Sequence, residues 1–110
     1  MDTSSEYKNM CQQAERAAPE LFYKSSYSVH DYVFKVEGND LLWWLPRQDQ
    51  LQDMMDLPTW RLVYNFSLWF GGVMEVGAEP IWKQYSMEQL WLAFVMQEKY
   101  NKTWNGNGWQ

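Results

Sequence analysis

The chain opens with a helical pattern of hydrophobic residues. Thr3-Ser4-Ser5-Glu6 has the spacing of a capping box, with a hydroxyl three residues before a glutamate. Apolar residues then recur at positions 7, 10, 11, 14, 17 and 18, which lie on one face of a helix. Pro19 disfavours a helical conformation in the residue before it. The pattern therefore predicts a helix over Ser4–Ala17.

Two hydrophobic runs around a glycine-containing turn follow, and they predict a β-hairpin. Positions 32, 34 and 36 alternate with 33, 35 and 37, and the run Leu41–Leu45 comes after the turn Gly38-Asn39-Asp40. Successive side chains of a strand point to opposite faces. The adjacent Trp43 and Trp44 therefore predict that both faces of this strand are covered.

Two further helices are predicted, one short and one deeply buried. Pro46 suits the first position of a helix. The apolar stripe of Leu51, Met54 and Met55 then predicts a short helix over 47–56, which Leu57-Pro58 ends. Residues 86–89 form a second capping box. The run Leu90–Met96 is apolar on every side, so we expect this last helix, which ends near Asn101, to be embedded in the core.

The stretch Trp60–Phe70 fits two structures. Every second residue from 60 to 70 is hydrophobic, which favours a long strand. A helix is the alternative, because Trp60, Val63 and Tyr64 also suit a helical stripe. Gly71-Gly72 is expected to end the element, with residues 73–76 or 81–85 returning as a further strand.

The order of elements, α-β-β-α-β-(β)-α-(β), predicts an α+β fold. We expect a small antiparallel sheet of three to five strands packed with about three helices. The C-terminal Trp104 and Trp109 flank Asn-Gly repeats, which fit either a terminal strand with a turn or a loop pinned by its tryptophans. A chain of 110 residues is typical of one globular domain, here 1–110.

Charge and composition exclude several classes of function. The net charge is −5, and residues 1–59 carry ten acids against five bases. Without a basic surface, direct nucleic-acid binding is not expected. One cysteine and one histidine cannot form a structural zinc site. Cys11 and His30 are the one pair available for nucleophilic catalysis, but Cys11 lies on the apolar stripe of its helix, and no carboxylate pair stands out. We therefore expect no enzyme activity, cofactor or metal.

Acidic residues and tryptophans remain as candidates for a contact surface. Helical spacing relates Asp49, Asp53 and Asp56, and Asp40 lies just upstream. These residues form either a solvated helix face, which is the simpler interpretation, or a surface on which a basic partner docks. Eight tryptophans are more than the interior is expected to hide, and tryptophan is enriched where proteins bind one another. Trp60, Trp82, Trp104 and Trp109 lie nearest loops or chain ends and are expected to be exposed. The predicted partner-binding residues are Asp40, Asp49, Asp53, Asp56, Trp60, Trp82, Trp104 and Trp109.

Two segments carry a resemblance to a known group of proteins. They are residues 44–52, WLPRQDQLQ, and residues 86–106, SMEQLWLAFVMQEKYNKTWNG. Together they resemble small uncharacterised proteins encoded by phages and prophages of Gram-positive bacteria. The resemblance covers about a quarter of the chain and carries no catalytic residues with it. It implies a small accessory protein that acts inside a bacterial cell.

These observations support three hypotheses for the function. The leading hypothesis is a non-enzymatic protein of the cytoplasm that binds a host protein. Its role would be to inhibit a defence or nucleic-acid-handling complex, as anti-CRISPR proteins do. A membrane location is not expected, since the longest apolar run is far shorter than the roughly 20 residues of a membrane helix, and the N-terminus lacks a secretory signal pattern. The alternatives are an aromatic-lined small-ligand or glycan-binding module and a homo-oligomeric structural part of a virion.

Overall fold

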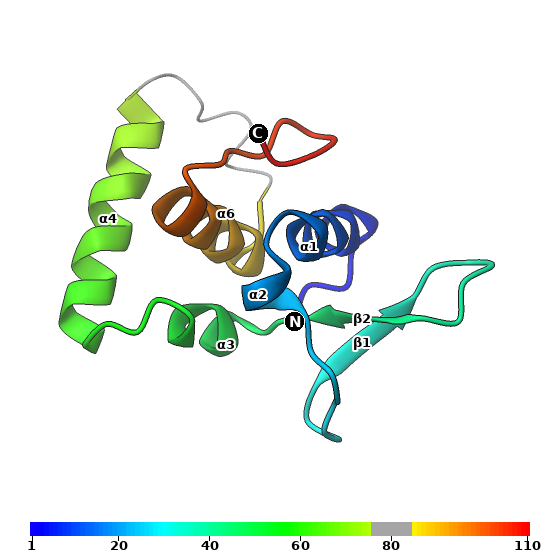
Figure 1. Cartoon of the computed structure of the whole chain (residues 1–110). Coiled ribbons are helices and arrows are strands. Elements are labelled where there is room, and N and C mark those ends of the chain that lie inside the picture. Colours follow the sequence, from blue (N-terminus) through cyan, green and yellow to red (C-terminus); the bar gives the residue numbers. More distant parts are fainter. Residues whose placement is uncertain (76–84) are drawn as a thin grey trace.

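The protein is built around the helix α6 (Met87–Tyr100), which the other elements surround (Figure 1). The computed structural model describes residues 1–75 and 85–110, with side chains outside 73–84. All residues from Leu90 to Met96 are buried, as their unbroken apolar run predicts. The predicted capping box is confirmed, because Ser86 and Gln89 bond each other's backbone N–H. The helix ends at Asn101, in a left-handed conformation.

The predicted N-terminal helix is confirmed as α1 (Ser5–Ala17), and its apolar stripe packs into the core. Ser4 is the cap, since its hydroxyl accepts a hydrogen bond from the backbone N–H of Tyr7. Thr3 and Glu6 do not form the predicted box. Pro19 ends α1 and begins the single turn α2 (Pro19–Phe22), as expected for a residue that is favoured at the first helical position.

The predicted hairpin is confirmed as β1 (Tyr32–Lys35) and β2 (Leu42–Leu45), an antiparallel pair in which Phe34 lies opposite Trp43. Trp43 and Trp44 are both buried, on opposite faces. Arg16 lies 5.6 Å from the ring centre of Trp43, and Lys24 lies 4.7 Å from that of Trp44. Each face is therefore covered in part by a cation on an aromatic ring.

Residues 59–75 form a helix, α4 (Thr59–Glu75), so the strand predicted over Trp60–Phe70 is wrong and the helical alternative is right. The helix continues through Gly71-Gly72, which were expected to end the element, so residues 73–75 are helical and not a strand. Residues 81–84 of the other predicted strand lie outside the described residues. The short helix α3 (Gln48–Asp53) precedes it and ends earlier than predicted. The α+β class holds. Among the described residues the sheet has two strands rather than three to five, because the stretch expected to supply a third strand is helical.

Aromatic stacking attaches α4 to the core. Phe66 stacks on Trp91 of α6 with ring centres 4.0 Å apart, and it meets Phe94 edge-on at 5.4 Å. Trp69 also lies 5.5 Å from Phe94. Leu62 completes this inner side and is buried. Such ring pairs add to the free energy gained from burial alone, so aromatic side chains attach one side of α4 to α6.

Two polar contacts join the hairpin region to the helices. The buried hydroxyl of Tyr7 donates to the carbonyl oxygen of Pro46 over 2.6 Å. The carboxylate of Asp31 accepts hydrogen bonds from Lys24, Gln50 and the backbone N–H of Ser28, at 2.9–3.1 Å. The hydrogen bond from the Ser28 backbone lowers the pKa of Asp31 well below its usual value, with the Gln50 and Lys24 side chains adding to it.

The Tyr7–Pro46 hydrogen bond gives a first prediction. Tyr7→Phe removes only the hydroxyl and leaves a buried carbonyl without its donor, so it should lower the free energy of unfolding by about 1–3 kcal/mol. Urea unfolding followed by far-UV circular dichroism measures this. Tyr23→Phe, at an exposed position, is the control and should change little. Equal stability of Tyr7→Phe and the wild type would contradict the assigned role of the hydroxyl.

The Asp31 contacts predict how stability depends on pH. Because the folded-state pKa lies below the ordinary value of 3.8, the contribution of Asp31 is present above that value. It is lost as the pH falls through 3.8 toward the folded-state pKa. Asp31→Asn should therefore lower stability at pH 7 and flatten the loss of stability below about pH 4. Urea midpoints from pH 7 to pH 3 test this, with Asp40→Asn in the exposed hairpin loop as the control.

Candidate functional site

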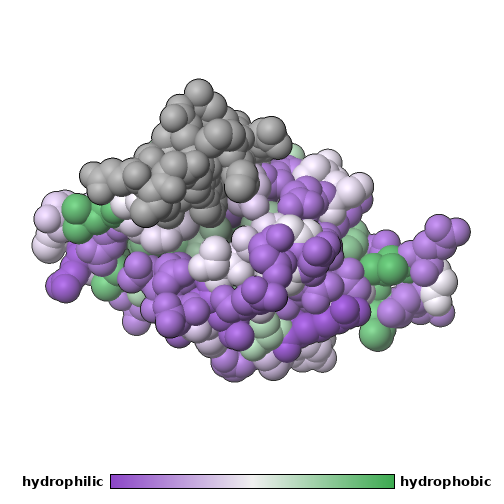
Figure 2. All heavy atoms as spheres, turned by 90° about the horizontal axis from the view of Figure 1, so that it is seen from above, coloured by the Kyte–Doolittle hydropathy of each residue, from purple (hydrophilic) through white to green (hydrophobic). Residues whose placement is uncertain are grey.

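The most unusual surface of the molecule is the side of α4 that points away from α6. Trp60 is 70 % exposed, Tyr64 and Leu68 are each 59 % exposed, and Val63 is 53 % exposed. In Figure 1, α4 lies at one edge of the molecule, with α6 on one side of it. Figure 2 shows hydrophobic residues at both ends of the molecule, where α4 and the hairpin lie. Four large apolar side chains of one helix are thus left in solvent.

These side chains belong to one continuous helical face. Residues three, four and seven positions apart point the same way on a helix. We call this the outer face of α4, and it consists of Trp60, Val63, Tyr64, Ser67, Leu68 and Gly71. Arg61 is the only charged residue from Thr59 to Gly72. The outer face therefore carries almost no charge over a length of about 16 Å at 1.5 Å per residue.

A helix with this composition is normally covered on all sides. Helices at a protein surface usually turn charged and polar residues to solvent, while helices that are apolar all round are buried. α6 obeys this rule, since its apolar residues on every side are buried. α4 does not, because its inner side packs on Trp91 and Phe94 while its outer face is open. A contiguous exposed apolar patch of this kind is typical of a site of interaction.

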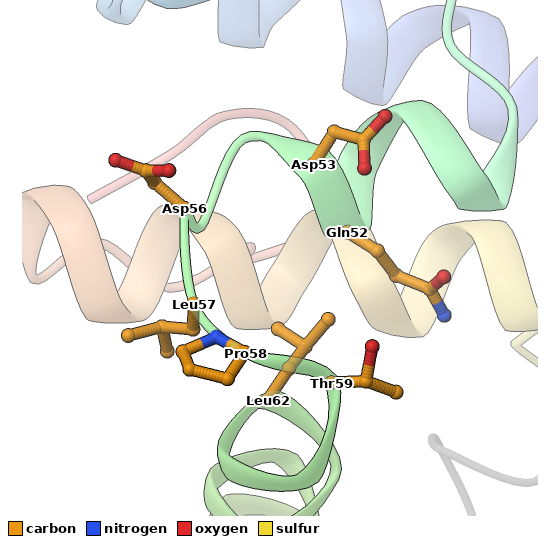
Figure 3. Close-up of a pocket in the computed structure, with 7 residues that line it drawn as sticks. All are labelled: Gln52, Asp53, Asp56, Leu57, Pro58, Thr59 and Leu62. Carbon is orange, nitrogen blue, oxygen red and sulfur yellow. The ribbon is translucent and has the colours of Figure 1, made fainter.

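An acidic hollow of about 490 Å³ lies at the start of α4 (Figure 3). Asp53 comes from α3, Asp56 from the turn after it, and Leu62 points across from α4. The remaining lining residues are Gln52, Leu57, Pro58 and Thr59. Because two carboxylates and no basic side chain line the hollow, it gives the beginning of α4 a negative border.

The predicted acidic stripe is broken up in the structure. α3 ends at Asp53, and Asp56 lies beyond it with a left-handed φ of 53°. Asp49 is 3.0 Å from Arg47, whose hydrogen bond lowers the pKa of its carboxylate. Asp40 lies in the hairpin loop, on the opposite side of the molecule from α4 (Figure 1). Only Asp53 and Asp56 are brought together, because the early end of α3 removes the helical spacing.

The predicted exposure is right for one tryptophan and wrong for two. Trp60 is exposed, whereas Trp104 and Trp109 are only 7 % and 8 % exposed. Trp104 Nε1 donates to a carboxylate oxygen of Glu6, and Trp109 Nε1 donates to the carbonyl oxygen of Met10. The terminal loop is thus pinned to α1 by its tryptophans. Trp82 lies outside the described residues.

Features that would support catalysis or metal binding are weak. The Cys11 thiol is buried, and burial raises its pKa, so it is not an activated nucleophile. His30 is exposed on a loop. Over residues 1–75 and 85–110, no three His, Cys, Asp or Glu side chains are grouped as ligands for one ion. In the same residues, none of the helices combines the length and the apolar character needed to cross a bilayer.

Comparison with protein-family models, with curated proteins and with solved structures gives no match to this chain.

Sequence reasoning singled out Trp60 but missed the rest of the outer face. Val63, Tyr64 and Leu68 were available as a signal, because they share a stripe with Trp60 if the segment is a helix. The strand interpretation put Val63 on the face opposite to the other three, so it divided the stripe. The exposed surface could therefore be found only once the segment was known to be helical.

The difference between Trp60 and Trp109 is directly measurable. Trp60→Phe should lower the fraction of tryptophan fluorescence that acrylamide quenches, because it removes a highly exposed indole, and it should hardly change stability. Trp109→Phe should leave that fraction unchanged and cost about 1–2 kcal/mol, since it removes a buried hydrogen bond and leaves a gap beside the smaller ring. The reverse pattern would show that the indole environments are wrongly assigned.

Proposed function

We propose that this chain is a non-enzymatic binding protein that contacts another protein through the outer face of α4. The observation that carries the proposal is the exposure of Trp60, Val63, Tyr64 and Leu68 on one nearly uncharged face. Trp and Tyr dominate the energetics of protein interfaces because they bury a large area at a small cost in rotamer entropy. An exposed patch that combines them with aliphatic residues is therefore suited to a protein partner.

The chemistry of the face favours a protein over a nucleic acid or a sugar. Nucleic-acid binding rests on basic residues that contact phosphates, and Arg61 is the only base from Thr59 to Gly72, close to the acidic hollow. A glycan site would combine aromatic rings with a polar cavity. The hollow beside α4 has no aromatic lining. A helix or strand with an apolar side of its own is the complementary shape.

The cellular setting of this contact rests on the resemblance of residues 44–52 and 86–106 to phage and prophage proteins. On that basis the partner is a protein of the bacterial host, and the setting is the cytoplasm. Stoichiometric inhibition of a defence or nucleic-acid-handling complex is the corresponding role. Asp53 and Asp56 line the hollow at the beginning of α4, and their negative charge there supports a partner with basic residues beside its apolar segment.

A capture experiment with matched variants tests the proposal. Wild-type protein, Leu68→Glu and Leu41→Glu are immobilised at low density and exposed to lysate of a Gram-positive host, and captured proteins are identified by mass spectrometry. Leu41 is as exposed as Leu68 but lies in the hairpin loop. The wild type and Leu41→Glu should both retain a host protein that uses the outer face. The captured amount of that protein should fall at least roughly tenfold with Leu68→Glu, because this variant places a charge in an apolar contact.

The captured protein is then purified and titrated against all three variants by calorimetry. Direct binding that is lost in Leu68→Glu alone supports the outer face as the docking surface. Equal binding by Leu68→Glu and the wild type would overturn the proposal, provided that circular dichroism shows both variants to be folded. Lost binding in Leu41→Glu alone would also overturn it and would place the contact on the hairpin.

A further inference from the structure

We infer that the outer face of α4 pairs with the same face of a second copy of this chain, with the two helices antiparallel. This inference rests on the proposed function in that it takes the outer face as a protein-docking surface, and it adds a second copy of the chain as an occupant of that surface. It is carried by the order of side-chain sizes along the face, by the small charge of the face and by its area.

The sizes along the outer face are complementary to themselves when the sequence is reversed. In an antiparallel pair, two residues face each other when their numbers have a constant sum. When the two-fold axis lies between Asn65 and Phe66, every residue of the outer face lies opposite another residue of the outer face. The facing pairs are Trp60 with Gly71, Val63 with Leu68 and Tyr64 with Ser67, each occurring twice.

Two of the three pairs place a large side chain opposite a small one, and the third joins the mid-sized Val63 and Leu68. The largest side chain, Trp60, faces a residue with no side chain, and the tyrosine faces a serine. A Cβ built on Gly71 would have no neighbour within 4 Å, so the space beside this glycine is open to an incoming indole. Closely packed interfaces need large groups to meet small ones. In a two-fold symmetric dimer both partners use the same patch. That patch must therefore be complementary in shape to itself.

Charge does not oppose the pairing. A second copy brings the same net charge of −5, which disfavours close approach in general. The outer face carries no acid, and the exposed Arg61, which lies three residues before Tyr64 and seven before Leu68, is the one base at its edge. In the antiparallel pair Arg61 lies opposite Phe70 and not opposite a second Arg61, so no like charges face each other. Repulsion between the copies therefore acts over longer distances, where salt screens it. Association is expected to strengthen as the ionic strength rises.

The area is sufficient for a weak, specific dimer. Aromatic side chains bury roughly 150–250 Å² each, so two aromatic and two aliphatic residues at these exposures offer on the order of 500 Å² per copy. Two copies together bury on the order of 1,000 Å², the lower limit for a specific interface. An interface of this size is typical of weak, transient association.

Sedimentation velocity and light scattering from about 1 µM to about 1 mM test the inference. The wild type should change from monomer to dimer over this range. Gly71→Leu should remain monomeric because it fills the space for Trp60, although replacing a helical glycine favours the fold of the single copy. Gly72→Ala is the matched control, since this glycine is equally open but lies off the outer face, and it should dimerise like the wild type.

A size exchange tests the register. Trp60→Ala combined with Gly71→Leu moves the large residue to the other end of the face, so the antiparallel pair regains a large group opposite a small one. The double variant should dimerise at least tenfold more strongly than Gly71→Leu alone. Dimerisation that Gly71→Leu leaves unchanged, or a double variant no better than Gly71→Leu, would overturn the antiparallel register.

The failure of this inference and the failure of the proposed function are distinguishable. A wild type that stays monomeric up to about 1 mM would overturn the second copy as partner. The capture of a host protein by the wild type, and its loss with Leu68→Glu, would still support the outer face as a docking surface. Conversely, a dimer that dissociates in both Gly71→Leu and Leu68→Glu supports the inference even if no host protein is captured.

Discussion

The complete burial of Leu90–Met96 is the constraint on which the remaining structure depends. A helix that is apolar on every side must be covered on every side, and α6 has neighbours in α1, in α3 and in the aromatic side chains of α4. The terminal loop is pinned to α1 by Trp104 and Trp109. The two-stranded hairpin contributes Leu45 to the core and packs Phe34 against it. Cations on its aromatic rings and the polar contacts of Tyr7 and Asp31 attach it further. The sheet is thus an attachment to a helical core.

Sequence reasoning worked where a cap and a periodic pattern agree, and it failed where the pattern has no polar side. α1 and α6 have hydroxyl caps and clear apolar spacing, so their limits were predicted to within a residue or two. In α4 both the inner and the outer side are apolar, so residues 60–70 fit a period of two as well as a period of 3.6. The misassigned element and the exposed surface have the same physical cause.

The candidate site was predictable only in part, because proximity to a loop or a chain end does not determine exposure. Trp104 and Trp109 are near the C-terminus, yet each indole N–H finds an acceptor on α1 and each ring is buried. Trp43, Trp44 and Trp91 are buried although none of their indole nitrogens has a hydrogen-bond partner in the structure. Asp53 and Asp56 line one hollow, as their grouping in the sequence predicts, but the turn after α3 brings them there and not a shared helical face.

The outer face of α4 has one set of side chains, so it can be covered by one partner at a time. A second copy and a host protein would both bury Trp60, Tyr64 and Leu68, and each would therefore exclude the other. With on the order of 1,000 Å² in the self-contact, the dimer is weak enough to exchange. It would shield the apolar face at high concentration, where exposed apolar patches lead to aggregation. At low concentration the same face would be free for a host protein.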